Sequence, residues 1–238
     1  MARMGRYFVA DQPLHVIQRG NNRQAIFFED RDYGLYHEWL AYAAREHGCA
    51  IHAYVLMTNH VHLLVTPSDT ESLPRMMQSL GRRYVRMINA RYRRTGTLWE
   101  GRYKAAPLDS DAYSFACSRY IELNPVRARM VKAPADYPYS SYRANALGEP
   151  DALVRQHALF ARLGPDAKAQ QKGYRELFQE KLEEQFVDDL RAATNGGWAL
   201  GDERFKKEIA EAAKRRAEPL PKGRPPEPRR DKRQINLL

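Results

Sequence analysis

The stretch Ile51–Thr66, IHAYVLMTNHVHLLVT, predicts two apolar β-strands joined by a turn at Thr58-Asn59. The second of these strands begins with His60-Val61-His62. Because side chains alternate between the two faces of a strand, His60 and His62 point to one face and Val61 to the other. Two neutral imidazoles on one face can bind a divalent cation, although such a pair is also common among partly buried structural histidines.

Length and composition limit the classes of protein to which the chain can belong. A chain of 238 residues can form one sizeable domain plus an appendage, and its 43% apolar content can fill a core. We find no apolar run of the roughly 18–20 residues that span a bilayer and no signal peptide at the start, so the expected partners exclude a membrane. The expected location is the cytoplasm, with nucleoid association. Cys49 and Cys117 are too few for a disulfide framework.

The charge is strongly positive, with a net value of +10. This excess predicts a polyanionic partner, most economically nucleic acid, although anionic membranes and ribosomes also attract basic chains. From Arg75 to Lys104 the basic residues are interrupted by a single acid, Glu100. A one-sided distribution of this kind favours contact with phosphates over an ordinary solvated surface.

The periodicity of the rest of the chain predicts an α+β fold. In order, we expect a strand at 14–19, a helix from 30 to about 47, the two central strands, a helix at 75–94, a strand at 102–108 and a helix at 111–123. Asn124-Pro125 stops the last helix, since the residue before proline is pushed out of the helical region. This order indicates a ferredoxin-like or RRM-like antiparallel sheet with helices on one face.

Beyond residue 145 the pattern changes. We expect a catalytic domain at 1–145, a helical appendage at 146–217 with helices at 153–163, 166–193 and 202–216, and a tail at 218–238. The tail is rich in proline and basic residues, a composition typical of disorder.

The helix that ends before Pro125 carries Tyr120 and Asn124, which lie four residues apart and therefore share a face. With His60 and His62 they could form a centre of two imidazoles, one amide oxygen and a phenol. The chain has 14 tyrosines, however, and spacing alone does not distinguish Tyr120 from a tyrosine packed on the sheet.

Several separated segments point to a known family: HVIQRGNNRQAIF, YVLMTNHVHLLV, GRYKAAPLD, RYIELNPVRARMV and YPYSSY, in this order. They resemble the small single-tyrosine HUH transposases, in particular the REP-associated tyrosine transposases, over roughly residues 7–145. The resemblance implies the HUH endonuclease fold, with His60 and His62 as ligands of a divalent cation and Tyr120 as the nucleophile. It implies Asn124 as a third ligand, at a position where related transposases often have glutamine.

The resemblance also implies a reaction and a substrate. Tyr120 would attack a phosphodiester of single-stranded DNA, leaving a 5′-phosphotyrosine and a free 3′-hydroxyl that can rejoin strands without ATP. A phenol is a poor nucleophile at neutral pH, and a nearby cation favours its ionised form. Oxygen and imidazole ligands with open positions suit Mg²⁺ or Mn²⁺. The expected partners are single-stranded DNA hairpins, the repetitive extragenic palindromes.

The candidate DNA contacts lie on the first turn, on the long helix and before the fourth strand. They are Arg19, Asn21, Asn22, Arg23, Arg82, Arg83, Arg86, Arg102, Tyr103 and Lys104. Guanidinium and amide groups can bind phosphates and base edges, and a tyrosine ring can stack on a base. A turn rich in asparagine can instead satisfy its own backbone.

Two other functions are compatible with the sequence. One is a DNA-hairpin-binding regulator of the same fold that does not cut. The other is a metal-dependent hydrolase with a metal-bound water, which would usually have further carboxylate or histidine ligands. Members of the REP-associated branch are thought able to act alone, so we expect a monomer, whereas simpler relatives are dimers that exchange the tyrosine helix.

Overall fold

The computed structural model describes residues 9–219. Its centre is a four-stranded antiparallel sheet with the order β2-β3-β1-β4. The strands are β1 (Leu14–Arg19), β2 (Cys49–Met57), β3 (His60–Pro67) and β4 (Lys104–Pro107). This order confirms the predicted ferredoxin-like α+β fold, and β2 and β3 are joined through Thr58 and Asn59 as expected. The predicted tail from residue 220 onward lies outside the described residues.

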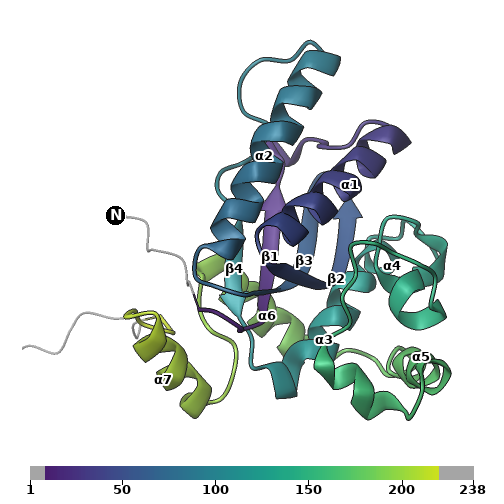
Figure 1. Cartoon of the computed structure of the whole chain (residues 1–238), viewed down its shortest axis with the longest axis vertical. Coiled ribbons are helices and arrows are strands. Elements are labelled where there is room, and N and C mark those ends of the chain that lie inside the picture. The colour runs from purple at the N-terminus through teal and green to yellow at the C-terminus, as the bar shows by residue number, and fades with distance from the viewer. Residues whose placement is uncertain (1–8, 220–238) are drawn as a thin grey trace, which may run out of the picture.

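Two helices cover one face of the sheet, α1 (Asp30–Glu46) and α2 (Ser72–Arg91) (Figure 1). Their buried residues, which include Tyr36, Leu40 and Tyr84, pack against Val16 and Leu63 of the central strands. The helix α2 begins three residues earlier than predicted. The Asp69 carboxylate accepts hydrogen bonds from the N–H groups of Glu71 and Ser72, which satisfies donors at the start of the helix.

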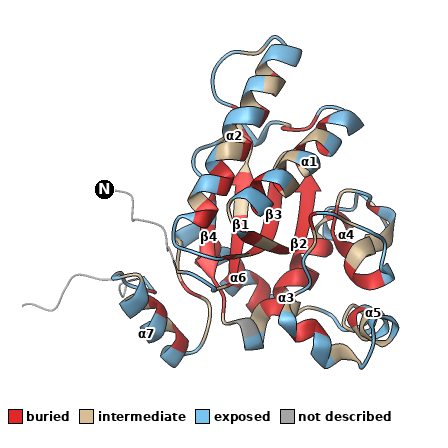
Figure 2. Cartoon of the chain, viewed as in Figure 1, coloured by how far each residue is buried: buried red, intermediate tan, exposed pale blue. Residues whose placement is uncertain are grey.

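The opposite face of the sheet is also covered, by α3 (Ser110–Glu122) and by α6 (Glu184–Gly196). Val55 and Leu64 of the sheet pack there with Ile121 of α3 and Leu190 of α6. The strands are therefore buried between two helical layers (Figure 2). The sequence predicted the helices on one face of the sheet, and this part of the prediction was wrong. The predicted helix 111–123, here α3, lies on the opposite face together with α6 from the region beyond residue 145.

The remaining elements are short. They are η1 (Asn21–Arg23), α4 (Asn124–Arg127), η2 (Pro134–Asp136), η3 (Arg143–Leu147), η4 (Ala158–Leu163), α5 (Ala167–Glu176) and α7 (Glu203–Ala212). No helix in the described part of the chain is long and apolar enough to cross a membrane.

All three predicted helices of the appendage were wrong in extent. The expected helix at 166–193 is divided into α5 and α6, because the chain turns where Phe178 packs against Tyr142 and Tyr174 with ring centroids 4.9 and 5.4 Å apart. The expected helix at 153–163 is reduced to η4, since Val154 pairs with Ile51 of β2 instead. The last helix ends at Ala212, before the expected 216.

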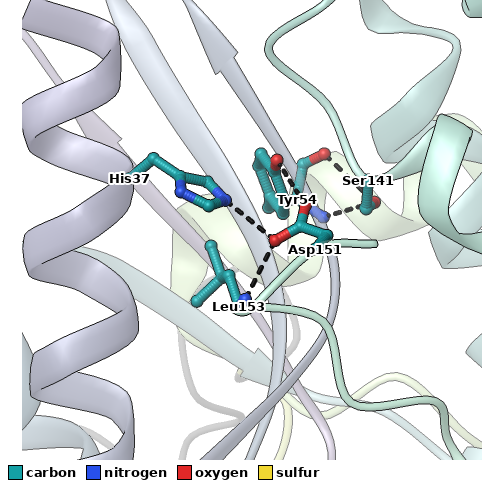
Figure 3. A network of polar contacts seen from close by, with 5 residues as sticks. All are labelled: His37, Tyr54, Ser141, Asp151 and Leu153. Carbon is teal, nitrogen blue, oxygen red and sulfur yellow. Dashed lines mark hydrogen bonds and ion pairs between the residues drawn. The ribbon is translucent and has the colours of Figure 1, made fainter. Parts of the chain in front are cut away.

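The outer edge of β2 is covered by the segment 139–155. The backbone N–H of Leu56 donates to the Tyr139 carbonyl over 2.9 Å, and the Asp151 carboxylate accepts from the Tyr54 hydroxyl at 2.8 Å. The same carboxylate bonds His37 of α1 and the N–H of Leu153, both over 2.9 Å (Figure 3). Covering an edge strand removes a surface for aggregation. These hydrogen bonds also join the predicted catalytic domain to residues beyond position 145.

Candidate active site

The structure brings Tyr120 of α3 over the sheet face that carries the paired histidines. The Tyr120 ring lies edge-on to the His62 ring, with centroids 5.7 Å apart, and His60 and His62 are separated by 5.0 Å. His15 of β1 completes the group, because its ring is stacked on His62 at 5.1 Å and is edge-on to Tyr120 at 5.7 Å. Strand alternation places His15, His60 and His62 on this one face. Tyr120 is only 4% exposed.

The hydrogen bonds of His60 leave one ring nitrogen available to a cation. Its Nδ1 atom lies 2.6 Å from the Oδ1 atom of Asn59, and the amide nitrogen of Asn59 donates to the Arg23 carbonyl. The Asn59 oxygen is therefore an acceptor, and His60 Nδ1 must be the donor. The lone pair on His60 Nε2 then points away from this bond, as a metal ligand requires.

The Nδ1 atom of His62 is also hydrogen-bonded, and its partner is the Nε2 atom of His15 at a distance of 2.8 Å. Burial lowers the pKa of His62 well below its ordinary value, and the charges of His15, His60 and Arg19 act in the same direction. Burial, together with the Arg19 charge, lowers the pKa of His60 to about 4. Both imidazoles are thus neutral at pH 7, which is the form that binds metals, so the donor set fits a divalent cation.

Asn124 lies at the start of α4, half-buried. Its amide nitrogen donates to the carbonyls of Tyr120, at 2.8 Å, and Ile121, at 3.3 Å, within its own helical turn. Among residues 9–219 no three His, Cys, Asp or Glu side chains gather as a metal site. The clustered carboxylates that the hydrolase alternative would usually supply are not found among these residues.

Cations surround the centre. The Arg127 guanidinium lies 5.1 Å from the Tyr120 ring centroid, and Arg19 is paired across the sheet with His60. Burial lowers the pKa of Arg127, and repulsion from Arg191 of α6 adds to this. Positive groups around a phenol and two imidazoles would attract a phosphate. Arg127 was not among the predicted site residues, although it lies within the segment RYIELNPVRARMV.

A cavity of about 500 Å³ lies beside the centre, between β1, β4 and the end of α6. Four of the predicted DNA contacts line it together: Arg19, Arg102, Tyr103 and Lys104. Lys104 donates to the Oδ1 atom of Asn195 over 2.9 Å, so α6 forms the second wall. The charged residues of the lining are mainly basic: Arg19, Arg102, Lys104 and Arg215, with Glu100 as the acid among them.

The predicted contacts on the first turn lie at the same end of the sheet as His60. The N–H of Gly20 donates to the Asn59 carbonyl over 2.9 Å, which holds the turn Asn21–Arg23 beside the β2–β3 turn. Asn22 and Arg23 are exposed there, and both have a positive φ. Tyr103 differs from its neighbours: although it lines the cavity, it is 7% exposed and belongs to the core cluster that contains residues of α1 and α2, so most of its ring is covered.

The predicted arginines of α2 lie away from the histidines, because α2 covers the other face of the sheet. Arg82, Arg83 and Arg86 are exposed and line a separate cleft of about 440 Å³ with Arg75 and His47. The Arg83 guanidinium lies over the Trp39 ring of α1, 5.2 Å from its centroid. The structure therefore divides the basic candidates between two surfaces.

The sheet order, with a histidine pair on a central strand, is that of the HUH endonuclease fold. Residues 8–124 match the model of the family described as "Transposase IS200 like", and the chain belongs to this family.

Similarity to one solved structure agrees with the fold. A REP-associated tyrosine transposase bound to a REP hairpin is similar with a TM-score of 0.53 and 17% identity, over 66% of this chain and 93% of that one. A putative transposase from Deinococcus radiodurans R1 is similar with a TM-score of 0.35 and 20% identity, over 51% and 96% of the two chains. Comparison with curated proteins gives no match.

Proposed function

We propose that this transposase cuts and rejoins single-stranded DNA at palindromic repeat hairpins through a covalent bond to Tyr120. The observation that carries the proposal is the edge-on contact of Tyr120 with His62, whose Nε2 side remains available to a cation together with that of His60. Family membership supports a DNA-processing enzyme. The similar structure, which holds a REP hairpin, supports this class of substrate.

His60 and His62 would hold Mg²⁺ or Mn²⁺ through their Nε2 atoms, with the Asn124 amide oxygen as the third ligand. The Asn124 amide nitrogen is occupied by its bond to the Tyr120 carbonyl, so the amide oxygen is the atom that would bind the cation. When bound, the cation would neutralise charge on the scissile phosphate and favour the phenolate.

In the cutting step, the Tyr120 phenol loses its proton and its oxygen forms a bond to the scissile phosphorus. The bond from phosphorus to the 3′ oxygen breaks, and that oxygen takes up a proton. The products are a 5′-phosphotyrosine and a free 3′-hydroxyl, and attack by a 3′-hydroxyl reverses the step. Because Tyr120 is 4% exposed and lies beneath Arg127, its side chain must move outward to meet the phosphate. The Arg127 guanidinium is then placed to stabilise the developing charge.

The DNA strand next to the cut would lie in the basic cavity between β4 and α6. Arg19, Arg102 and Lys104 would bind its phosphates. The turn Asn21–Arg23, which lies beside the β2–β3 turn, would contact bases. The arginines Arg82, Arg83 and Arg86 would bind phosphates of the hairpin stem along the other surface. Tyr103 would support this region from the core rather than stack on a base.

We further propose that the protein acts as a monomer, because α3 packs against β2 and β3 of its own chain. Tyr120 therefore meets the histidines without exchange of helices between subunits. The residues of the predicted appendage, 146–217, would complete the DNA cavity through Asn195.

The test is a labelled single-stranded hairpin incubated with protein and Mn²⁺ or Mg²⁺, followed by a denaturing gel. We expect a protein adduct on the downstream fragment that is lost in Tyr120→Phe and retained in Tyr113→Phe. Tyr113 is the matched control, since it lies in the same helix and its ring stacks on Phe186 at 5.7 Å. Cleavage without an adduct would favour the hydrolase, and binding without cleavage would favour the regulator.

A further inference from the structure

A buried chain of hydrogen bonds connects α6 with His62. The Thr194 hydroxyl of α6 lies 2.7 Å from the Leu190 carbonyl and 2.7 Å from the Nδ1 atom of His15. The Nε2 atom of His15 lies 2.8 Å from the Nδ1 atom of His62. Thr194, His15 and His62 are all at most 3% exposed, so water does not compete for these bonds.

The donor and acceptor groups fix which atom donates in each of these hydrogen bonds. The Leu190 carbonyl can only accept, so the Thr194 hydroxyl donates its hydrogen there, and its oxygen accepts from His15 Nδ1–H. His15 makes no bond to a carboxylate among the described residues, and a protonated imidazole buried in this way is costly. A neutral His15 with its hydrogen on Nδ1 has an acceptor at Nε2. His62 Nδ1 must then be the donor, which leaves the lone pair of His62 on Nε2.

The two paired histidines are thus supported from different parts of the chain. His60 is held by Asn59, its neighbour in sequence, whereas His62 is held through His15 by Thr194. Thr194 lies far beyond residue 124, where the match to the family model ends. Partners that orient a ligating histidine typically change metal affinity by roughly 10–100-fold when they are removed.

We propose that His15 and Thr194 are positioning residues that hold His62 in the tautomer with its lone pair on Nε2, so that α6 sets the affinity of the divalent-cation site. This inference rests on the proposed role of His60 and His62 as cation ligands. It makes the docking of α6 on the sheet a requirement for tight cation binding, beyond its contribution to packing.

The test compares Thr194→Val, which keeps the shape but removes the acceptor, with Thr194→Ser, which retains it. Mn²⁺ binding to the full chain is measured by titration without DNA. We expect roughly 10–100-fold weaker binding in Thr194→Val and binding within about threefold of the wild type in Thr194→Ser. Thr66→Val is the matched control, because Thr66 bonds the buried His52 at 2.9 Å, away from the centre, and should leave Mn²⁺ binding unchanged.

A second measurement reads the tautomer directly. In metal-free protein labelled with ¹⁵N-histidine, NMR should show the hydrogen of His62 on Nδ1 in the wild type and a mixture of tautomers in Thr194→Val. If Thr194→Val does not fold, as judged by circular dichroism, His15→Gln and His15→Leu replace it. Glutamine can donate to Thr194 and accept from His62, whereas leucine can do neither.

The outcomes separate this inference from the proposed function. A wild type that does not bind Mn²⁺ would overturn the cation site itself. A wild type that binds Mn²⁺, with folded Thr194→Val binding equally well, would overturn the positioning role alone. Equal loss in Thr194→Val and Thr194→Ser would also overturn it, since the loss would then reflect packing.

Discussion

The buried carboxylate of Glu122 fixes the helix that carries Tyr120, and this contribution can be measured. Glu122 accepts hydrogen bonds from Ser141 at 2.6 Å, Asn145 at 3.0 Å and the Tyr174 hydroxyl at 2.8 Å. Burial raises the pKa of Glu122 to about 7, against the opposing effect of these three donors. We predict that Tyr174→Phe lowers the free energy of unfolding, and that the loss increases with pH.

The loss of unfolding free energy in Tyr174→Phe depends on whether the acceptor, Glu122, is charged. Well below pH 7 the folded Glu122 is protonated, and Tyr174→Phe removes a bond between neutral groups, which is worth about 1 kcal/mol. Above pH 7 the bond is to a carboxylate and is worth about 1.5–3 kcal/mol. This direction agrees with proton linkage. Because the pKa of Glu122 is higher in the folded chain than in the unfolded chain, where it is 4.5, proton binding stabilises the fold below pH 4.5, and this stabilisation is lost as the pH rises through 7. Removing a donor raises the pKa further, so the variant loses more at high pH.

Urea unfolding at pH 5.5 and pH 8.5 measures this difference. With an m-value of roughly 2 kcal/mol/M, the midpoint of Tyr174→Phe should fall by about 0.5 M at pH 5.5 and about 1 M at pH 8.5. Tyr36→Phe is the matched control, since the Tyr36 hydroxyl is buried without a hydrogen-bond partner in the described part of the chain. That variant should be as stable as the wild type or more so. Equal losses at both pH values, or an equal loss in the control, would refute the reasoning.

Three further predictions concern the sheet and the DNA surface. Gly20→Ala should destabilise the protein by about 1–3 kcal/mol in urea unfolding, because an added Cβ would lie 2.3 Å from the Gln24 carbonyl oxygen; a neutral effect would contradict this close approach. Burial lowers the pKa of His52 from 6.5 to about 4. Because the unfolded chain therefore binds a proton at this histidine more tightly than the folded chain, the free energy of unfolding should fall by up to about 3 kcal/mol as the pH falls from 6.5 to about 4. His52→Gln should reduce that pH dependence, and an identical pH profile would exclude His52 as its source. Arg102→Ala should weaken hairpin binding and reduce the slope of log affinity against log salt by about 0.7, whereas an unchanged slope in fluorescence anisotropy would show that Arg102 contacts no phosphate.

Local patterns were enough to predict the sheet. The alternation in Ile51–Thr66 defined β2, β3 and the shared face of His60 and His62, because strand geometry depends on neighbouring residues alone. The same alternation in Leu14–Arg19 places His15 on that face, so its approach to the histidine pair could have been inferred from the sequence.

Features that depend on long-range packing were not predictable. No proline or glycine marks the division between α5 and α6, which follows from the docking of Phe178 on an aromatic cluster. The bond between His15 and Thr194 joins residues 179 positions apart, and no sequence pattern signals it. Tyr103, by contrast, lies between two exposed cations, and strand alternation alone places it on the opposite side, in the core. Its prediction as a DNA contact overlooked this alternation.

The most direct test of the central claim is to locate the covalent bond. After incubation with the hairpin and Mn²⁺, the protein is digested with nuclease and trypsin and analysed by tandem mass spectrometry. Cleavage after Arg119 and Arg127 releases the peptide YIELNPVR, in which Tyr120 is the single tyrosine. We predict a nucleoside 5′-phosphate on this peptide. Its attachment to a different peptide, or strand cleavage with no modified peptide, would contradict the assignment of Tyr120 as the nucleophile.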